Sequence, residues 1–203
     1  MNSTYLYEYV DSFEKVLSIA YITHYSLDAV ERLVSYSSFF QRIEKDYNGS
    51  APIISNKALS KSLFPELDIN IEDIPVHNQC LWAAEAYLKI QQTCKLTFEA
   101  IFLYCPIKKM FAYFDLYHEM DFSQIINEFN NLYEGQSAFS LLLKKFHYSL
   151  NYISEQTGLS YNTLYSLKSR RRDIKKMNIE SLIAIANVFN VRLETLAEIK
   201  LQK

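Results

Sequence analysis

The sequence SLNYISEQTGLSYNTLYSLK occupies residues 149–168 of this 203-residue chain and determines how its C-terminal third folds. In its first half Leu150 and Ile153 lie three residues apart, and in its second half Leu164 and Leu167 repeat that interval. Intervals of three or four residues place side chains on one face of an α-helix. The stretch therefore predicts two short helices, each with one buried face, joined by a tight turn.

The turn between these two helices is marked by a glycine and a serine. Gly158 stands where the first helix must stop, and glycine takes the left-handed conformation that ends a helix without a steric penalty from a Cβ atom. Ser160 offers a hydroxyl that can accept a hydrogen bond from the free N–H groups of the next helix. The sequence thus predicts where the first helix ends and where the second begins.

The composition is that of an ordinary globular protein. Apolar residues make up 49% of the chain and charged residues 22%, so disorder is not expected. No run of eighteen apolar residues occurs, and the N-terminus lacks the basic and apolar segments of a signal peptide. We therefore expect a cytoplasmic protein that does not interact with a membrane.

Cysteine and glycine usage argues against several kinds of site. Cys80, Cys94 and Cys105 are odd in number and contain no Cys-x-x-Cys pair, so we interpret them as reduced core residues rather than disulfides or zinc ligands. Only three glycines occur, and they are far apart, which excludes the glycine-rich loops that bind nucleotide phosphates. Neither a metal nor a cofactor is expected.

The stretch most similar to a catalytic site is DLYHEMD, residues 115–121, which places His118 among three carboxylates. It lacks the second histidine of a His-Glu-x-x-His helix and has no cysteine partner. A solvated helix end with a paired histidine is the commoner explanation of such a stretch, and the other histidines are isolated. We therefore predict no catalytic residues and no enzymatic activity.

Charge is distributed unevenly along the chain. Residues 1–135 hold 10 Lys and Arg against 18 Asp and Glu, which gives −8, whereas residues 136–203 hold 11 against 5, which gives +6. A basic segment joined to an acidic one suggests that only the basic half meets a polyanion. We expect an acidic domain at 1–135 that dimerises or binds a partner, followed by a second domain at 136–203.

Helical periodicity covers most of the acidic part, so the fold class is predicted to be all-α. Turn-forming residues predict a loop at 46–52 and a linker at 134–137. Residues 60–75 are too irregular for helices, and a brief strand or an extended connector is expected there. Helices are predicted at 5–24, 26–34, 76–93 and 96–104, then beyond Pro106, and at 121–129 with Asp121 as the N-cap.

Five helical segments follow in the basic part, at 139–146, 150–157, 160–168, 179–189 and 193–199. On these segments residues 138–199 resemble the helix-turn-helix domain of the Cro/CI (Xre) family of phage repressors and bacterial regulators. The family pattern of Leu-Ala followed by Gly, a hydrophobic residue and Ser is present as Ile153-Ser154 and Gly158-Leu159-Ser160.

The sequence departs from the family pattern at four places. Leu150 stands where a phosphate-binding Gln is usual, Ser154 replaces Ala, and Arg170 replaces a common Gly. Asn190 ends the fourth helix in place of Gly, and Asn tolerates the left-handed conformation better than most residues. Asn178 is the predicted N-cap of that helix. Its apolar residues are expected to be core: Leu182, Ile183, Ile185, Ala186 and Phe189.

The resemblance implies that residues 160–168 form a recognition helix that lies in the major groove of duplex DNA. Asn162 would read adenine, and the basic residues that follow would contact phosphates. Without the resemblance, Arg170-Arg171-Arg172 would be read as a solvated charge run. The implied DNA-binding residues are Asn151, Ser160, Tyr161, Asn162, Thr163, Tyr165, Ser166, Lys168, Arg170, Arg171, Arg172, Lys175 and Lys176.

Three classes of function remain open. The first is a sequence-specific transcriptional regulator, a repressor or autorepressor, that binds double-stranded DNA as a homodimer formed through its N-terminal region. The second is an antitoxin or phage-encoded inhibitor whose N-terminal domain binds a partner protein while the C-terminal domain autoregulates. The third, an enzyme in the N-terminal domain, is least favoured because no paired catalytic set is present.

Overall fold

A computed structural model describes residues 3–45, 55–67 and 74–201 of the chain. Within these ranges the protein contains thirteen α-helices and no strand, which confirms the all-α fold class. None of the described helices has both the length and the apolar character needed to cross a membrane.

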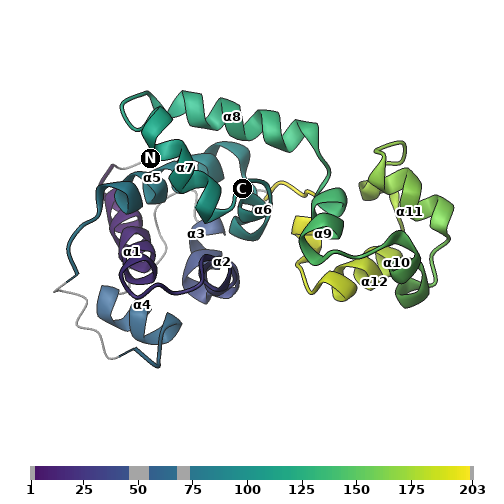
Figure 1. Ribbon diagram of the computed structural model, residues 1–203, viewed down its shortest axis with the longest axis horizontal. Coiled ribbons are helices and arrows are strands. Elements are labelled where there is room, and N and C mark those ends of the chain that lie inside the picture. The colour runs from purple at the N-terminus through teal and green to yellow at the C-terminus, as the bar shows by residue number, and fades with distance from the viewer. Residues whose placement is uncertain (1–2, 46–54, 68–73, 202–203) are drawn as a thin grey trace.

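The helices form two connected groups, with α8 passing from one to the other along the top of the view in Figure 1. We call α1–α8 the N-terminal body and α9–α13 the C-terminal module. The body comprises α1 (Ser3–Ile22), α2 (Leu27–Tyr36), α3 (Ser38–Lys45), α4 (Asn56–Leu63), α5 (Asn78–Cys94), α6 (Phe98–Tyr104), α7 (Ile107–Tyr117) and α8 (Phe122–Gly135). The module comprises α9 (Ala138–Phe146), α10 (Leu150–Thr157), α11 (Tyr161–Lys168), the 3₁₀ helix η2 (Ile174–Lys176), α12 (Ile179–Phe189) and α13 (Leu193–Leu196).

The core of the body is a cluster of aromatic rings contributed by α1, α3, α5 and α6. The Phe13 ring lies edge-on to Phe40 at a centroid distance of 4.9 Å and to Phe98 at 5.6 Å, and it stacks on Tyr87 at 5.8 Å. All four side chains are fully buried. Such ring pairs add stabilisation beyond their buried area, so this cluster fixes the packing of α1 against α5.

Two predicted segments of the body differ from the structure. Residues 60–63, expected to be irregular, belong to α4, which is stabilised by a local cap: the Ser55 hydroxyl accepts a hydrogen bond from Ala58 N at 3.3 Å. Leu59 and Leu63 anchor this helix in the core, although its eight residues are too few to show clear periodicity. The predicted linker at 134–137 is shorter than expected, because α8 continues through Gly135. The predicted loop at 46–52 lies outside the described residues.

The body and the module share a buried ionic interface. Arg192, which precedes α13, donates from Nη1 and Nη2 to the two carboxylate oxygens of Glu44 on α3, each at 2.8 Å. The Glu44 side chain is only 1% exposed, and it also accepts Phe98 N at 2.6 Å. Beside this pair the hydroxyls of Thr97 and Thr195 lie 3.0 Å apart. Two regions of opposite net charge are therefore joined by a desolvated ion pair.

The C-terminal end of the described chain returns to the body. Leu201 N donates to Lys95 O at 2.7 Å, and Glu198 accepts from the Tyr104 hydroxyl and from Ala138 N. The contacts of Leu201 and Glu198 with the body, together with the Arg192–Glu44 pair, hold the C-terminal part of the module to the body. The helix α11 lies at the end of the molecule farthest from the body (Figure 1). The division at residue 136 stays a prediction.

Candidate nucleic-acid interface

The turn between α10 and α11 has the geometry that the sequence predicts. Gly158 has φ +70° and ψ 4°, and its N–H donates to Ser154 O at 2.8 Å to close α10. The Ser154 hydroxyl donates to Leu159 O at 2.6 Å. Serine at this position therefore adds a hydrogen bond that braces the turn, which an alanine could not supply.

The second helix of the motif begins at its predicted cap. The Ser160 hydroxyl accepts Thr163 N at 3.2 Å, and Ser149 caps α10 in the same way through Tyr152 N at 3.1 Å. Leu164 is 0% exposed and anchors α11 to the rest of the module. Because the caps and this anchor fix both position and rotation of α11, its opposite face is presented to solvent as a rigid surface.

Gly158→Ala should destabilise the protein by about 1–2 kcal/mol, because a left-handed residue with a side chain is strained. An added Cβ atom would meet no atom within 4 Å, so the loss comes from the backbone alone. Urea unfolding monitored by circular dichroism measures it. Gly135→Ala is the matched control, since Gly135 has equal space and no positive φ, and it should be neutral or slightly stabilising. Equal losses in both variants would contradict the turn assignment.

Two tyrosines dominate the exposed face of α11. Tyr161 is 48% exposed and Tyr165 is 45% exposed, and their rings stack at a centroid distance of 6.4 Å and an angle of 12°. The guanidinium of Arg171 lies 5.9 Å from the centre of the Tyr165 ring, a cation–π distance that holds the arginine beside the helix. Asn162, between the tyrosines in sequence, is exposed as well.

The hydroxyls of the two remaining polar residues of α11 already have hydrogen-bond partners within the protein. Thr163 is half-buried and its hydroxyl lies 3.0 Å from that of Ser160, within the capping group. The Ser166 hydroxyl donates to Asn162 O at 2.8 Å and is half-buried. Both can still accept a hydrogen bond, but neither extends as far from the helix as Asn162.

A basic segment continues directly from α11. Besides Arg170, its exposed cationic residues are Lys168, Arg171, Arg172, Lys175 and Lys176. The Asp173 side chain accepts Lys175 N at 3.0 Å and caps η2, and Arg172 N donates to Ser166 O at 3.1 Å. The segment is therefore ordered against the end of α11, and its Arg171 lies beside the exposed ring of Tyr165. Asn151, also exposed, lies in the first turn of α10.

Arg170 differs from its neighbours in what it contacts. Its guanidinium donates to the carbonyl oxygens of Tyr133, Glu134 and Gln136 at the C-terminal end of α8, where the helix dipole favours a cation. Its backbone is left-handed, with φ 55°, as expected where the family usually has glycine. Arg170 thus fastens the basic segment to α8, and its contact with a DNA phosphate stays a prediction.

Helix α12 begins and ends as predicted, but one residue predicted to be buried is exposed. The Asn178 side chain caps α12 through Ser181 N at 2.8 Å, and Asn190 is left-handed with φ 51°. Leu182, Ile185, Ala186 and Phe189 are buried, but Ile183, predicted to be core, is 41% exposed. Ile183 follows Ile179 by one turn on the outer side of the helix, which no element of the chain covers within the described residues.

The histidine cluster of residues 115–121 does not assemble a site. His118 is exposed, its Nδ1 lies 2.8 Å from Phe114 O, and its Nε2 lies 3.7 Å from the exposed Glu119 carboxylate. Within the described residues no three His, Cys, Asp or Glu side chains are grouped as metal ligands would be. The ring stacks on Phe114 at 4.5 Å, so His118 belongs to a solvated helix end.

Comparison with protein families agrees with this geometry. Residues 139–202 match the family model of the Cro/C1-type helix-turn-helix DNA-binding domain. Comparisons with curated proteins and with solved structures gave no match. The C-terminal module is therefore a Cro/C1-type helix-turn-helix DNA-binding domain, which confirms the resemblance seen in the sequence and supports a DNA-binding regulator.

Proposed function

We propose that this protein is a cytoplasmic transcriptional repressor that binds specific DNA sequences, including its own promoter. The observation that carries the proposal is the exposed face of α11, where Asn162 and two stacked tyrosines stand beside an ordered basic segment. A rigid polar helix of this kind fits the major groove, and the flanking cations fit the phosphates on either side. The end of the molecule opposite the body is free to approach DNA (Figure 1).

In the proposed complex the residues divide into two groups. Tyr161, Asn162 and Tyr165 would meet base edges, with Thr163 and Ser166 as shorter hydrogen-bonding groups. Ser160 and Asn151, near the N-termini of α11 and α10, would meet phosphates together with the cations. The proposed phosphate contacts from cations are Lys168, Arg171, Arg172, Lys175 and Lys176.

We also propose that the protein binds DNA as a homodimer. One recognition helix makes few contacts, whereas two helices about 34 Å apart read successive half-sites on one face of the duplex. The N-terminal body is the proposed source of the dimer interface. Sedimentation of the full chain should give twice the monomer mass, and a monomer at all concentrations would contradict this part of the proposal.

Arg171→Ala should weaken binding to every duplex by a similar factor and should reduce the slope of log affinity against log salt by about 0.9, because one phosphate contact is lost. Fluorescence anisotropy at several salt concentrations measures both quantities. Lys61→Ala is the control, since it removes an exposed cation from α4 in the body. If both substitutions have the same effect, the affinity reflects overall charge rather than this surface.

Repression itself is tested by transcription in vitro from the DNA upstream of the protein's own gene. The full chain should lower transcript yield, and Asn162→Ala should restore it. A yield that rises with added protein would contradict repression while leaving DNA binding intact.

A further inference from the structure

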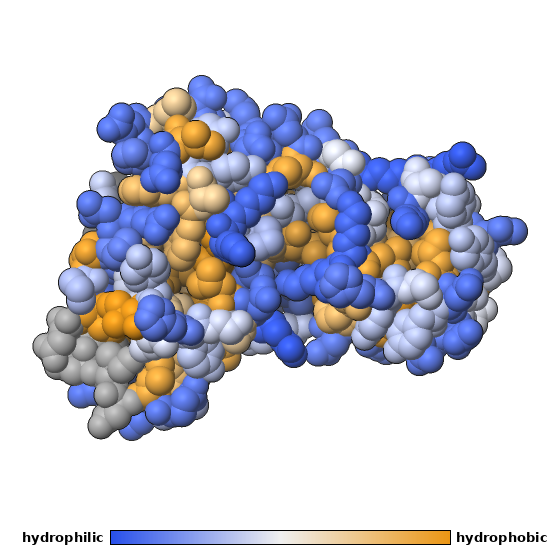
Figure 2. All heavy atoms as spheres, viewed as in Figure 1, coloured by the Kyte–Doolittle hydropathy of each residue, from blue (hydrophilic) through white to orange (hydrophobic). Residues whose placement is uncertain are grey.

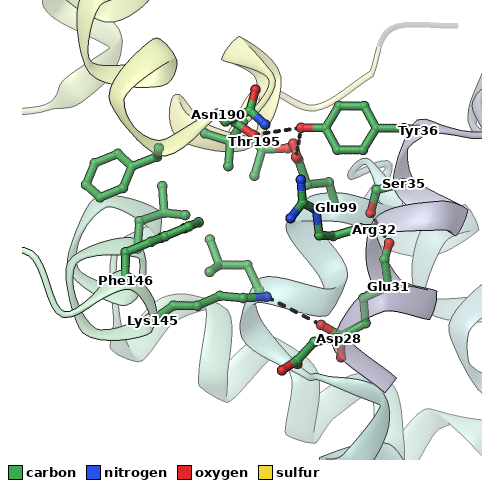
Figure 3. Close-up of a pocket in the computed structure, with 14 residues that line it drawn as sticks. Asp28, Glu31, Arg32, Ser35, Tyr36, Glu99, Lys145, Phe146, Asn190 and Thr195 are labelled. Carbon is green, nitrogen blue, oxygen red and sulfur yellow. Dashed lines mark hydrogen bonds and ion pairs between the residues drawn. The ribbon is translucent and has the colours of Figure 1, made fainter. Parts of the chain in front are cut away.

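An open pocket of about 340 Å³ lies between the N-terminal body and the C-terminal module. The body contributes α2 and α6, and the module contributes α9, α12, α13 and the segment between α12 and α13 (Figure 3). In Figure 2 the waist of the molecule is hollowed, with apolar side chains visible inside a hydrophilic border. The size is that of a small-molecule site.

The module supplies an apolar wall to this pocket. Leu142 and Phe189 are buried and line it, as does Leu103 from α6. Phe146 also lines it but is 37% exposed, and its ring is supported from behind by Phe189 at 5.8 Å and by Tyr148 at 5.6 Å. A supported aromatic ring that faces open space offers a flat surface for an apolar ligand.

Two of the three acidic residues that line the pocket, Glu31 and Glu99, already accept hydrogen bonds within the protein. Glu31 is 3% exposed and accepts Ile107 N at 2.8 Å and Lys145 Nζ at 3.4 Å, and burial raises its pKa. Glu99 accepts the Tyr36 hydroxyl at 2.8 Å and Arg192 N at 2.9 Å. These two carboxylates thus join the two walls of the pocket, and they are not free to bind a ligand.

Arg32 is the cationic side chain on the body wall of the pocket. Its guanidinium projects into the pocket, across from Phe146 (Figure 3), and within the described residues it forms no hydrogen bond or ion pair. Lys145 crosses the same space from the opposite wall, with its side chain 42% exposed. Asp28 also lines the pocket and lies below Glu31 in this view (Figure 3). An available guanidinium, an accessible ammonium and an apolar wall thus surround one cavity.

We propose that this pocket binds a small organic acid with an apolar body. Its carboxylate accepts hydrogen bonds from Arg32 and from Lys145, and its apolar part lies on Phe146 and the wall behind it. Because the two walls belong to the body and the module, the acid binds only while they are packed together, and it stabilises that arrangement. The role of the acid as an effector rests on the proposed function, whereas its binding does not.

Isothermal titration of the full chain without DNA tests the site, with 4-phenylbutyrate as the probe. The acid should bind with a Kd on the order of 1 mM, as expected for a small ligand of modest efficiency. Its uncharged counterpart 4-phenylbutanamide should bind at least about tenfold more weakly, since a charged hydrogen bond is lost. Equal binding of acid and amide, or no binding of the acid, would overturn the proposal.

Arg32→Gln should weaken binding of 4-phenylbutyrate at least about tenfold with no change in melting temperature, because Arg32 is exposed. Arg42→Gln, on an exposed arginine of α3 outside the pocket, is the matched control and should bind as the unaltered protein does. Unchanged affinity in Arg32→Gln would overturn the site. In DNA titrations, an affinity that 4-phenylbutyrate leaves unaltered would overturn the effector role, whereas absence of DNA binding under all conditions would contradict the proposed function instead.

Discussion

Glu44→Ala is expected to lower the free energy of unfolding by about 3–5 kcal/mol, the range for removing one partner of a buried ion pair. The Glu44 carboxylate is 1% exposed and receives two hydrogen bonds from Arg192, at 2.8 Å each, and one from Phe98 N at 2.6 Å. Without it, the two Nη groups of Arg192 and the backbone N–H of Phe98 lose their acceptor, and Arg192 keeps only the longer contact from Nε to Glu99, at 3.7 Å. The effect is large because the free-energy cost of removing Arg192 from water remains when the Glu44 carboxylate is gone.

Urea unfolding of the full chain measures this loss, and Glu85→Ala is the matched control. Glu85 also forms an ion pair, with Lys89 one turn later at 3.7 Å, but its side chain is 37% exposed. Exposed helical pairs contribute only about 0.3–0.5 kcal/mol. A loss in Glu44→Ala no larger than in Glu85→Ala would show that the body and the module are not joined through this pair.

Asn162→Ala is expected to remove about 1–3 kcal/mol of discrimination at one base position, which is the contribution of a bidentate contact to adenine. Asn162 is exposed on α11, and its side chain has no hydrogen bond among the described residues, so its amide is available to a base. Affinity for unrelated duplexes should change little, because phosphate contacts supply that part of the binding.

Selection of bound duplexes from a random pool, carried out with the unaltered chain and with the variant, measures base preference at each position. Asn187→Ala, at an exposed asparagine of α12 in the same module, serves as the control and should give the unaltered motif. Identical motifs from Asn162→Ala and the unaltered chain would show that α11 does not read the base edges.

The N-terminal caps of several helices are predictable from the sequence, because capping is local. Asp121, Ser160 and Asn178 each accept a backbone N–H within three residues of their own position, so the signal and its effect lie in one short stretch. The left-handed conformations at Gly158 and Asn190 were predictable for the same reason. The match of residues 139–202 to the family model confirms the predicted domain type for the C-terminal module.

Contacts between distant parts of the chain were not predictable in this way. Glu44 and Arg192 are separated by 148 residues, and nothing in either local sequence shows that they meet. Arg170 belongs to a run of arginines, and its local sequence does not show that its guanidinium donates hydrogen bonds to the end of α8. Ile183 followed the helical pattern of its neighbours, yet its exposure depends on which faces of α12 the other helices cover. The pocket between the body and the module is likewise a product of their packing.

Hydrogen–deuterium exchange of the full chain, with and without a duplex selected from the random pool, tests the central claim that the α11 face binds DNA. DNA binding through this face should slow exchange in α11 and in the basic segment through Lys176, with α1 and α5 of the body unchanged. Slower exchange confined to the N-terminal body, or none in α11 when the duplex is bound, would contradict it.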